Sequence, residues 1–171
     1  MLDKTRFGCR VYSIAEEFGV TQVQVNTIIN TFINVCREDL INGHIINFVG
    51  LVSVVPDYVV TDYVGTTAWY SKIVAQMLSI PYNTTHVIIK AYLDELKADV
   101  VQGKSVDIRR IVTLHPLCNE SGTLITLHAS ISVSVKKELQ YRNTGVSSVR
   151  AHTNKLLKRF LKNSAIEVVS R

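Results

Sequence analysis

Apolar residues recur at three- and four-residue steps in two long stretches of the chain, residues 25–40 and 88–100. This spacing places them on one face of a helix. The sequence Thr21-Gln22-Val23-Gln24 ahead of the first stretch has the pattern of a capping box. Gly43 and Gly103 follow the two stretches, where glycine commonly ends a helix. The pattern therefore predicts two long helices of the same design.

A short helix is predicted before each long helix, and a strand hairpin after it. The first short helix is expected to begin at the capping box Ser13-Ile14-Ala15-Glu16 and to stop at Gly19, and the second to cover about residues 71–78. Residues 45–54 and 106–114 are rich in β-branched side chains, which favours two short strands in each. The chain therefore carries the order helix, helix, strand, strand twice.

Three segments lie outside this order. Residues 57–70, between the two copies, are too few for an additional strand and helix, and we expect them to pack on the surface of the core. Residues 123–135 alternate enough to predict one longer strand, and residues 147–161 predict a basic amphipathic helix.

The two copies align without a gap at a shift of 60 positions, so that residues 14–56 match residues 74–116. Identical pairs include Asp39 with Asp99 and Pro56 with Pro116. A repeat of this length implies two copies of one supersecondary unit, each with an apolar face to bury. The simplest partner for each copy is the other copy.

The order of elements resembles that of the HU/IHF family of bacterial histone-like proteins. Residues 43–54 resemble the helix end and strand signature of that family, including its Val-Gly turn. Residues 103–114 resemble it with Arg110 in place of the turn glycine, and Val149-Arg150-Ala151 is weakly similar to the start of its closing helix. Because the family works as an intertwined dimer, the resemblance implies a fused pseudo-dimer.

The predicted fold class is α+β, with tandem HU/IHF-like units. Two helix pairs form a helical core, accompanied by short antiparallel β-hairpins and a C-terminal helix. Residues 1–64 are the first half, truncated after its hairpin, and residues 65–171 are the second, with the long strand and the basic C-terminal helix.

The composition, with 47% apolar and 19% charged residues, is that of a globular protein. No run approaches the roughly 18 apolar residues that span a bilayer, and no signal peptide is apparent at the N-terminus. Cys9, Cys36 and Cys118 are far apart and have no metal-binding spacing. We expect inert thiols, no membrane partner and a reducing cytoplasmic location, with incorporation into a virus particle as an option.

Positive charge is concentrated at the C-terminal end. Residues 131–171 carry nine Lys and Arg residues against Glu138 and Glu167, a net +7, whereas residues 1–130 have a net charge of −2. These cations could contact phosphates, meet an acidic partner or form a solvated helix face. The candidate contacts are Arg150, Lys155, Lys158, Arg159, Lys162, Lys136 and Lys137, with Arg109 and Arg110 at the second hairpin turn.

The family bends DNA with two long basic β-arms that end in an Arg-Asn-Pro tip. This chain has no room for an arm in the first copy, and in the second copy residues 115–122 form only a short turn without that tip. The flanking strands have almost no cations with which to neutralise phosphates. No DNA-binding residue of the family has a matching position here.

We predict no enzymatic activity, no cofactor, no metal and no small-molecule substrate. The sequence contains no phosphate-binding glycine loop, no HExxH and no nucleophile elbow. His115 and His128 are expected to flank the second hairpin, and Cys118 is near them in sequence. A trio of two histidines and one cysteine lacks a fourth ligand, so we predict no metal or acid–base site there.

Two functions follow from these patterns. The first is a structural or assembly role as a protein–protein building block, for which a phage virion is one setting. Another subunit could extend the uncharged edge strand by strand addition. Its candidate residues are Thr123, Ile125, Leu127, Ile131, Val133 and Val135. The alternative is an architectural DNA-binding protein that uses the basic C-terminal helix.

Overall fold

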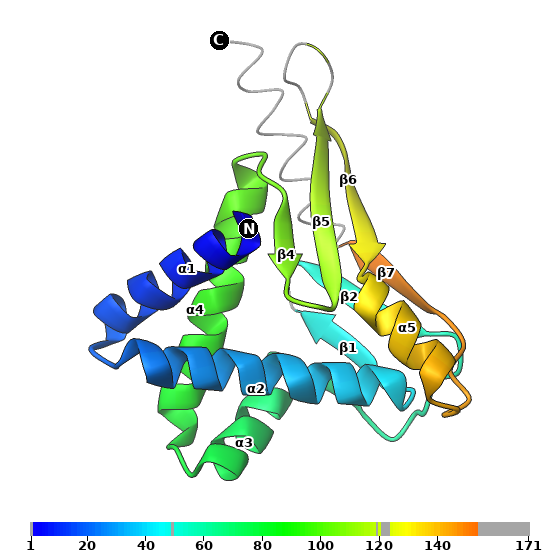
Figure 1. The fold of residues 1–171 in the computed structure, drawn as a ribbon, viewed down its shortest axis with the longest axis horizontal. Coiled ribbons are helices and arrows are strands. Elements are labelled where there is room, and N and C mark those ends of the chain that lie inside the picture. The colour runs from blue at the N-terminus through cyan, green and yellow to red at the C-terminus, as the bar shows by residue number, and fades with distance from the viewer. Residues whose placement is uncertain (1, 49, 119, 121–123, 154–171) are drawn as a thin grey trace.

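The computed structural model describes residues 2–48, 50–118, 120 and 124–153. These residues form five helices and seven strands in a mixed α+β fold (Figure 1), which confirms the predicted class. The helices are α1 (Leu2–Phe18), α2 (Gln22–Ile41), α3 (Thr67–Leu78), α4 (Tyr82–Val101) and α5 (Val133–Tyr141). The strands are β1 (Ile45–Phe48), β2 (Val52–Pro56), β3 (Val64–Thr66), β4 (Val106–Ile108), β5 (Val112–Cys118), β6 (Leu124–Ile131) and β7 (Val149–Thr153).

The repeat in sequence is also a repeat in structure. Helices α1 and α2 with strands β1 and β2 correspond to α3 and α4 with β4 and β5, in the same order. The hairpin turns use the same bond, since Leu51 N–H donates to the Phe48 carbonyl at 2.9 Å and Ile111 N–H donates to the Ile108 carbonyl at 3.0 Å. Each pair lies 60 positions from its counterpart, so the turn geometry is common to both copies.

Each short helix packs against the long helices of both copies, and α2 and α4 pack against each other. Helix α1 packs against α4, where Arg10 Nη2 lies 2.6 Å from Asp99 Oδ2. Helix α3 packs against α2, where the Tyr70 hydroxyl donates to Asp39 Oδ2 at 2.9 Å. Both donors and both acceptors differ by 60 positions, so each copy is tied to the other by an equivalent contact. The copies therefore share one core.

Local signals place the long helices correctly. Gln24 N–H donates to Thr21 Oγ1 at 3.1 Å, and Thr21 N–H donates to Gln24 Oε1 at 3.3 Å, so the predicted capping box is present. Gly43 and Gly103 have φ of 98° and 82°, a conformation that glycine adopts without steric cost. Gly50 has φ of 84° at the first hairpin turn. Both helix ends and this turn lie where they were predicted.

The predicted start of the first helix is wrong. Helix α1 begins at Leu2, and Ser13 lies inside it. The reason is tertiary packing, because Val11 and Ile14 are buried and the Phe7 ring packs edge-on against Tyr92 of α4 at 6.1 Å. These contacts extend the helix through the capping-box sequence. The predicted stop at Gly19 is confirmed.

The linker prediction is also wrong. Residues 64–66 form β3, which pairs in parallel with β1 at the edge of a sheet of order β3-β1-β2-β7. Thr66 then caps α3 by accepting from Trp69 N–H at 3.3 Å, so that helix begins at Thr67 and not at about Ser71. Three residues of strand are too few to give a periodic signal.

The long strand ends earlier than predicted. Strand β6 closes the second sheet, of order β4-β5-β6, and stops at Ile131. Ser132 caps α5 by accepting from Ser134 N–H at 3.3 Å. Val135 and Leu139, four positions apart, are buried and give α5 its apolar face. The last three residues of the predicted strand, Val133 to Val135, are therefore the start of a helix.

A basic helix from residue 147 is not formed at residues 149–153, which are strand β7. It pairs antiparallel with β2, from Val52 opposite Thr153 to Pro56 opposite Val149. A neighbouring contact supports this pairing, because the Ser147 N–H donates to Asp57 Oδ1 at 3.0 Å and the Ser147 hydroxyl donates to Asp57 Oδ2. The rest of that predicted helix lies outside the described residues. The division of the chain after residue 64 stays a prediction. Strand β3 (Val64–Thr66) crosses that position, and β7 pairs with β2 of the first half.

The Asp57–Ser147 contact predicts a loss of stability in acid. The serine hydroxyl and N–H donate to the Asp57 carboxylate and lower its pKa to about 2. A depressed pKa means that the carboxylate stabilises the fold above its ordinary pKa of about 3.9, and that this contribution disappears as the pH falls toward about 2. Asp57→Asn should therefore be less stable than wild type at neutral pH, and the difference should shrink between about pH 4 and about pH 2.

Urea titrations at several pH values measure this effect, with Ser147→Ala as the companion variant. Removal of the hydroxyl donor should weaken the same pH dependence without a change in charge. A stability difference between wild type and Asp57→Asn that stays constant over this pH range would contradict the assignment.

Candidate functional site

Those of the predicted basic residues that the structure describes lie on three different elements. Lys136 and Lys137 are exposed on α5, and Arg150 is exposed on β7, which is a strand and not the predicted helix. Lys155, Lys158, Arg159 and Lys162 lie outside the described residues. The structure therefore places the described candidates on α5, on β7 and at the β4–β5 turn.

Arg109 and Arg110 lie at the predicted turn, and each side chain reaches an asparagine of α2. The Arg109 guanidinium carbon lies 4.0 Å from the centre of the Phe7 ring, and its Nη1 donates to Asn30 Oδ1 at 3.2 Å. Arg110 is exposed and its Nη1 lies 3.5 Å from Asn34 Oδ1. Both side chains belong to the second copy and reach α2 of the first.

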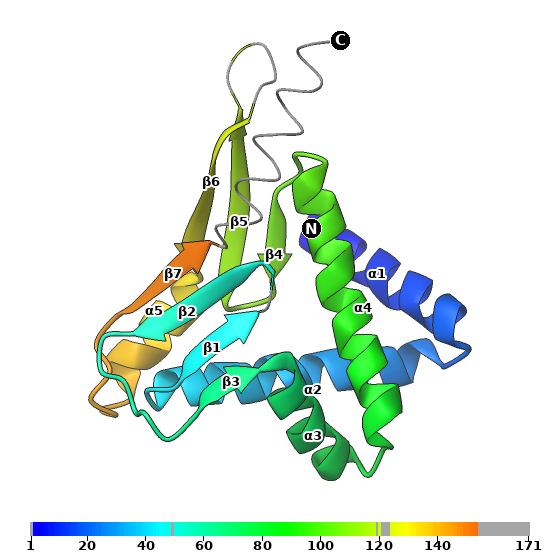
Figure 2. The ribbon, with the colours of Figure 1, turned by 180° about the vertical axis from the view of Figure 1, so that it is seen from behind.

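The predicted edge strand is only partly an open edge. Strand β6 is the last strand of its sheet, but it lies beside β7 in both views (Figures 1 and 2). Leu127 is buried, and Ile131 is half-buried against the core. Val133 and Val135 lie in α5, so they are not strand residues. Thr123 lies outside the described residues, and Ile125 lies within β6.

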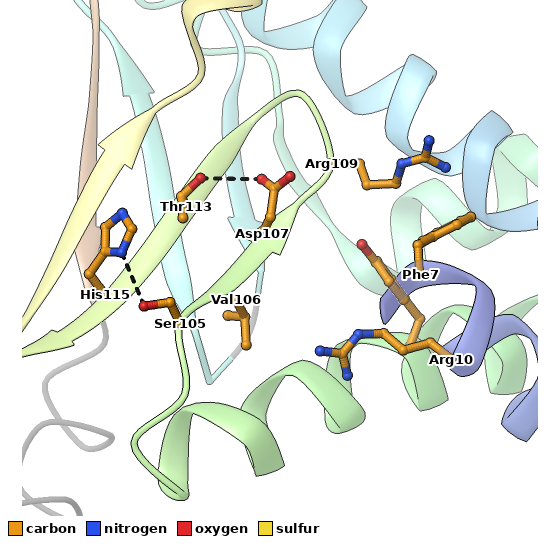
Figure 3. A pocket seen from close by; sticks show the side chains of 9 residues that line it. Phe7, Arg10, Ser105, Val106, Asp107, Arg109, Thr113 and His115 are labelled. Atoms are coloured by element: carbon orange, nitrogen blue, oxygen red, sulfur yellow. Dashed lines mark hydrogen bonds between the residues drawn. The ribbon is translucent and has the colours of Figure 1, made fainter. Parts of the chain in front are cut away.

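A pocket of about 280 Å³ lies between α1 and the polar face of the second sheet (Figure 3). The Ser105 hydroxyl and His115 Nδ1 are 3.2 Å apart, and Thr113 Oγ1 donates to Asp107 Oδ1 at 3.3 Å. Burial raises the pKa of the Tyr92 phenol in its wall. A hydrogen-bonded serine and histidine do not by themselves define a catalytic site, because a nucleophile also needs an oriented base and oxyanion donors.

A second hollow, which we call the α2–α5 groove, has a volume of about 390 Å³. It is lined by Arg37, Arg110, Ser134, Lys137, Glu138 and Tyr141. Arg37 is only 6% exposed, and its Nη1 donates to the Arg110 carbonyl and, at 2.9 Å, to Ser134 Oγ. The groove thus joins two predicted cations, Arg110 and Lys137, to a buried arginine.

The charges around the α2–α5 groove are unbalanced. Burial lowers the pKa of Arg37, and the neighbouring Arg110 guanidinium lowers it further. Glu138 is engaged by Arg142, whose Nε lies 3.2 Å from Glu138 Oε2. Arg142 also pairs with Glu38, and this contact raises the pKa of Arg142. Four cations therefore surround two carboxylates that Arg142 already engages, and the arrangement favours binding of an anion.

Sequence reasoning missed Arg37. Arg37 follows Cys36 on the buried side of α2. Nothing in the sequence immediately around it indicates a binding site. One signal was available in the repeat, because Lys97 occupies the corresponding position of α4. The Lys97 amine lies close to the turn at Gly50, 3.4 Å from where a Cβ on that glycine would be. Arg37 likewise lies close to the turn at Arg110, since its Nη1 donates to the Arg110 carbonyl. A cation at this position reaches the hairpin turn of the opposite copy in both cases.

Within the described part of the chain, no three His, Cys, Asp or Glu side chains are grouped so that they could hold a metal ion. Cys36 is buried, and burial raises the pKa of its thiol, whereas Cys9 is exposed. None of the described helices combines the length and apolar character required to cross a membrane.

Comparison with known proteins adds no further assignment. No family model, curated protein or solved structure matches this chain.

Proposed function

We propose that this chain is a fused HU/IHF-like pseudo-dimer that serves as a non-enzymatic structural protein, a subunit of a larger protein assembly such as a phage virion. The repeated order of two helices and a hairpin supports this proposal, as does the packing of each short helix against the long helix of the other copy. Because each copy buries its apolar face against the other, a second chain is not needed to complete the core.

The observation that carries the proposal is the ribbon of β5 and β6. It extends well past the first residue of β4 (Figure 1), and neither strand contains Lys or Arg. A ribbon that follows a nucleic-acid backbone needs several cations to neutralise phosphates. An uncharged ribbon with the half-exposed Leu117 near its end is better suited to contact another protein.

The native mass of the protein tests the assembly role. Purified under native conditions from its source, the chain should run in a stoichiometric complex well above its own 19.2 kDa. Leu117→Lys should reduce the fraction in the complex with little change in melting temperature, because the side chain is 47% exposed. Val23→Lys, at an exposed position of α2, is the matched control and should assemble normally. A species of 19.2 kDa alone would contradict the proposal.

The DNA-binding alternative retains one supporting observation, the exposure of Lys136, Lys137 and Arg150. It predicts binding that weakens steeply with salt, in proportion to the phosphates contacted. A gel shift on duplex DNA over a salt series tests it, with Lys155, Lys158, Arg159 and Lys162 replaced by alanine. The assembly proposal expects no shift even at low salt, whereas a shift that these substitutions abolish would support the alternative.

A further inference from the structure

We propose that the α2–α5 groove binds a single phosphate group, held by Arg37 at its floor and by Arg110 and Lys137 at its rim. This inference goes beyond the assembly role and does not depend on it. It rests on three observations: the burial of Arg37, the left-handed backbone conformation of Arg110, and the absence of Lys and Arg from β5 and β6 beyond the groove.

Arg37 is the first observation. Its side chain comes from α2 and contacts only neutral oxygens, those of the Arg110 carbonyl and the Ser134 hydroxyl, through its Nη1. A buried charge is normally paired with an opposite charge. Among the described residues, none of the ion pairs includes Arg37. A phosphate in the groove would supply the missing negative charge, and the planar guanidinium can bind two of its oxygens at once.

Arg110 is the second observation. Its φ is 63°, which lies in the left-handed region that side chains other than glycine rarely adopt. Gly50 occupies the corresponding turn of the first copy with φ of 84° and without this strain. The same turn is therefore built by glycine in one copy and by a strained arginine in the other. Strain of this kind is often found where the side chain has a binding role.

The extent of the positive surface favours one phosphate over a nucleic-acid backbone. Lys137 and Arg110 are exposed at the groove, but β5 and β6, which leave the turn next to it, contain no Lys or Arg. On the α5 side Glu138 lines the groove and binds Arg142. A backbone of successive phosphates would need cations at regular intervals beyond this point. A single phosphate monoester would find all its contacts within the groove.

Binding of inorganic phosphate to the intact protein tests the inference. Isothermal titration at fixed ionic strength, with sodium chloride in the reference, should show saturable binding to wild type. Arg110→Gly should weaken it by at least about tenfold, because one charge-assisted contact is lost. This variant should fold, since Gly50 builds the equivalent turn. Arg37→Lys should weaken binding by a similar factor, because lysine cannot form the two-pronged contact. Lys72→Ala, at an exposed position of α3, is the control and should bind as wild type does.

Three results would overturn the assignment. The first is a heat of binding to wild type that does not saturate, or that chloride at equal ionic strength reproduces. The second is equal affinity for phosphate in wild type, Arg110→Gly and Lys137→Ala. Duplex DNA serves as a competitor that identifies the source of the phosphate. The third is competition in which DNA displaces bound phosphate at lower concentration than a simple phosphate monoester does, with the same dependence on Arg110. That result would mean that the groove binds a nucleic-acid backbone and not a single phosphate.

Discussion

Phe32→Ala is expected to lower the free energy of unfolding by about 3–5 kcal/mol, the range for a phenylalanine removed from a packed core. Phe32 lies on α2 and is fully buried, at 0% exposure. Its ring packs against Phe48 of β1 and against Tyr70 of α3, each at 6.1 Å between ring centres. The cavity left by alanine would therefore open between the two copies, at the junction on which the shared core depends.

Denaturant unfolding, followed by far-UV circular dichroism and by fluorescence of Trp69, measures this loss. Both signals should shift together in the variant, because Trp69 lies on α3 of the second copy and Phe32 on α2 of the first. Val23→Ala, at an exposed position of the same helix, should change stability by no more than about 0.5 kcal/mol. Separate transitions for the two probes would mean that the copies do not share one cooperative core.

The elements that could be predicted from the sequence are those that local interactions determine. Helix α2 has its apolar periodicity, its capping box at Thr21 and its glycine stop at Gly43, all within 25 residues of one another. The hairpin at Gly50 likewise depends on neighbouring residues. When local signals agree with the fold in this way, the pattern alone is sufficient.

The elements that were missed depend on distant partners. Strand β7 forms because residues 149–153 can pair with β2, almost 100 positions earlier. In the sheet β3-β1-β2-β7 it takes the place that β6 takes in the sheet β4-β5-β6, since Val54 pairs with Ala151 as Leu114 pairs with Ala129. A basic, mildly apolar segment gives no sign of such a partner, and its local pattern suggested a helix. Pairing over this separation is a tertiary effect that overrides propensity.

The candidate sites divide in the same way. The turn at Arg109 and Arg110 could be located because it follows two predicted strands, but its surroundings could not. Arg109 stacks on Phe7 only because α1 extends back to Leu2, and the groove at Arg110 exists only because residues 133–141 form α5. Helical periodicity places Arg37 on the buried face of α2 without indicating what it meets there. The cation at the corresponding position of the repeat, Lys97, was the available signal, but it does not reveal the contact with the Arg110 turn.

Gly65→Ala is expected to lower the free energy of unfolding by about 2–4 kcal/mol, through overpacking at a buried position. A Cβ at residue 65 would lie 1.9 Å from the Tyr70 hydroxyl and 2.3 Å from its Cζ. The Tyr70 ring is 1% exposed and cannot move outward without disturbing the hydrogen bond from its hydroxyl to Asp39 at 2.9 Å. Strand β3 and helix α3 meet at this glycine, so the clash would separate the linker from the core.

Equilibrium unfolding of Gly65→Ala, of Tyr70→Ala and of the double variant separates this clash from a general effect on β3. If the Tyr70 ring causes the loss, alanine at residue 65 should cost little in the Tyr70→Ala background, and the coupling energy should be about as large as the single effect. Gly8→Ala is the matched control, because nothing lies within 4 Å of the added methyl group in α1, and it should stabilise the helix by about 0.5–1 kcal/mol. An undiminished cost of Gly65→Ala without the tyrosine ring would show that the backbone of β3, and not Tyr70, requires glycine.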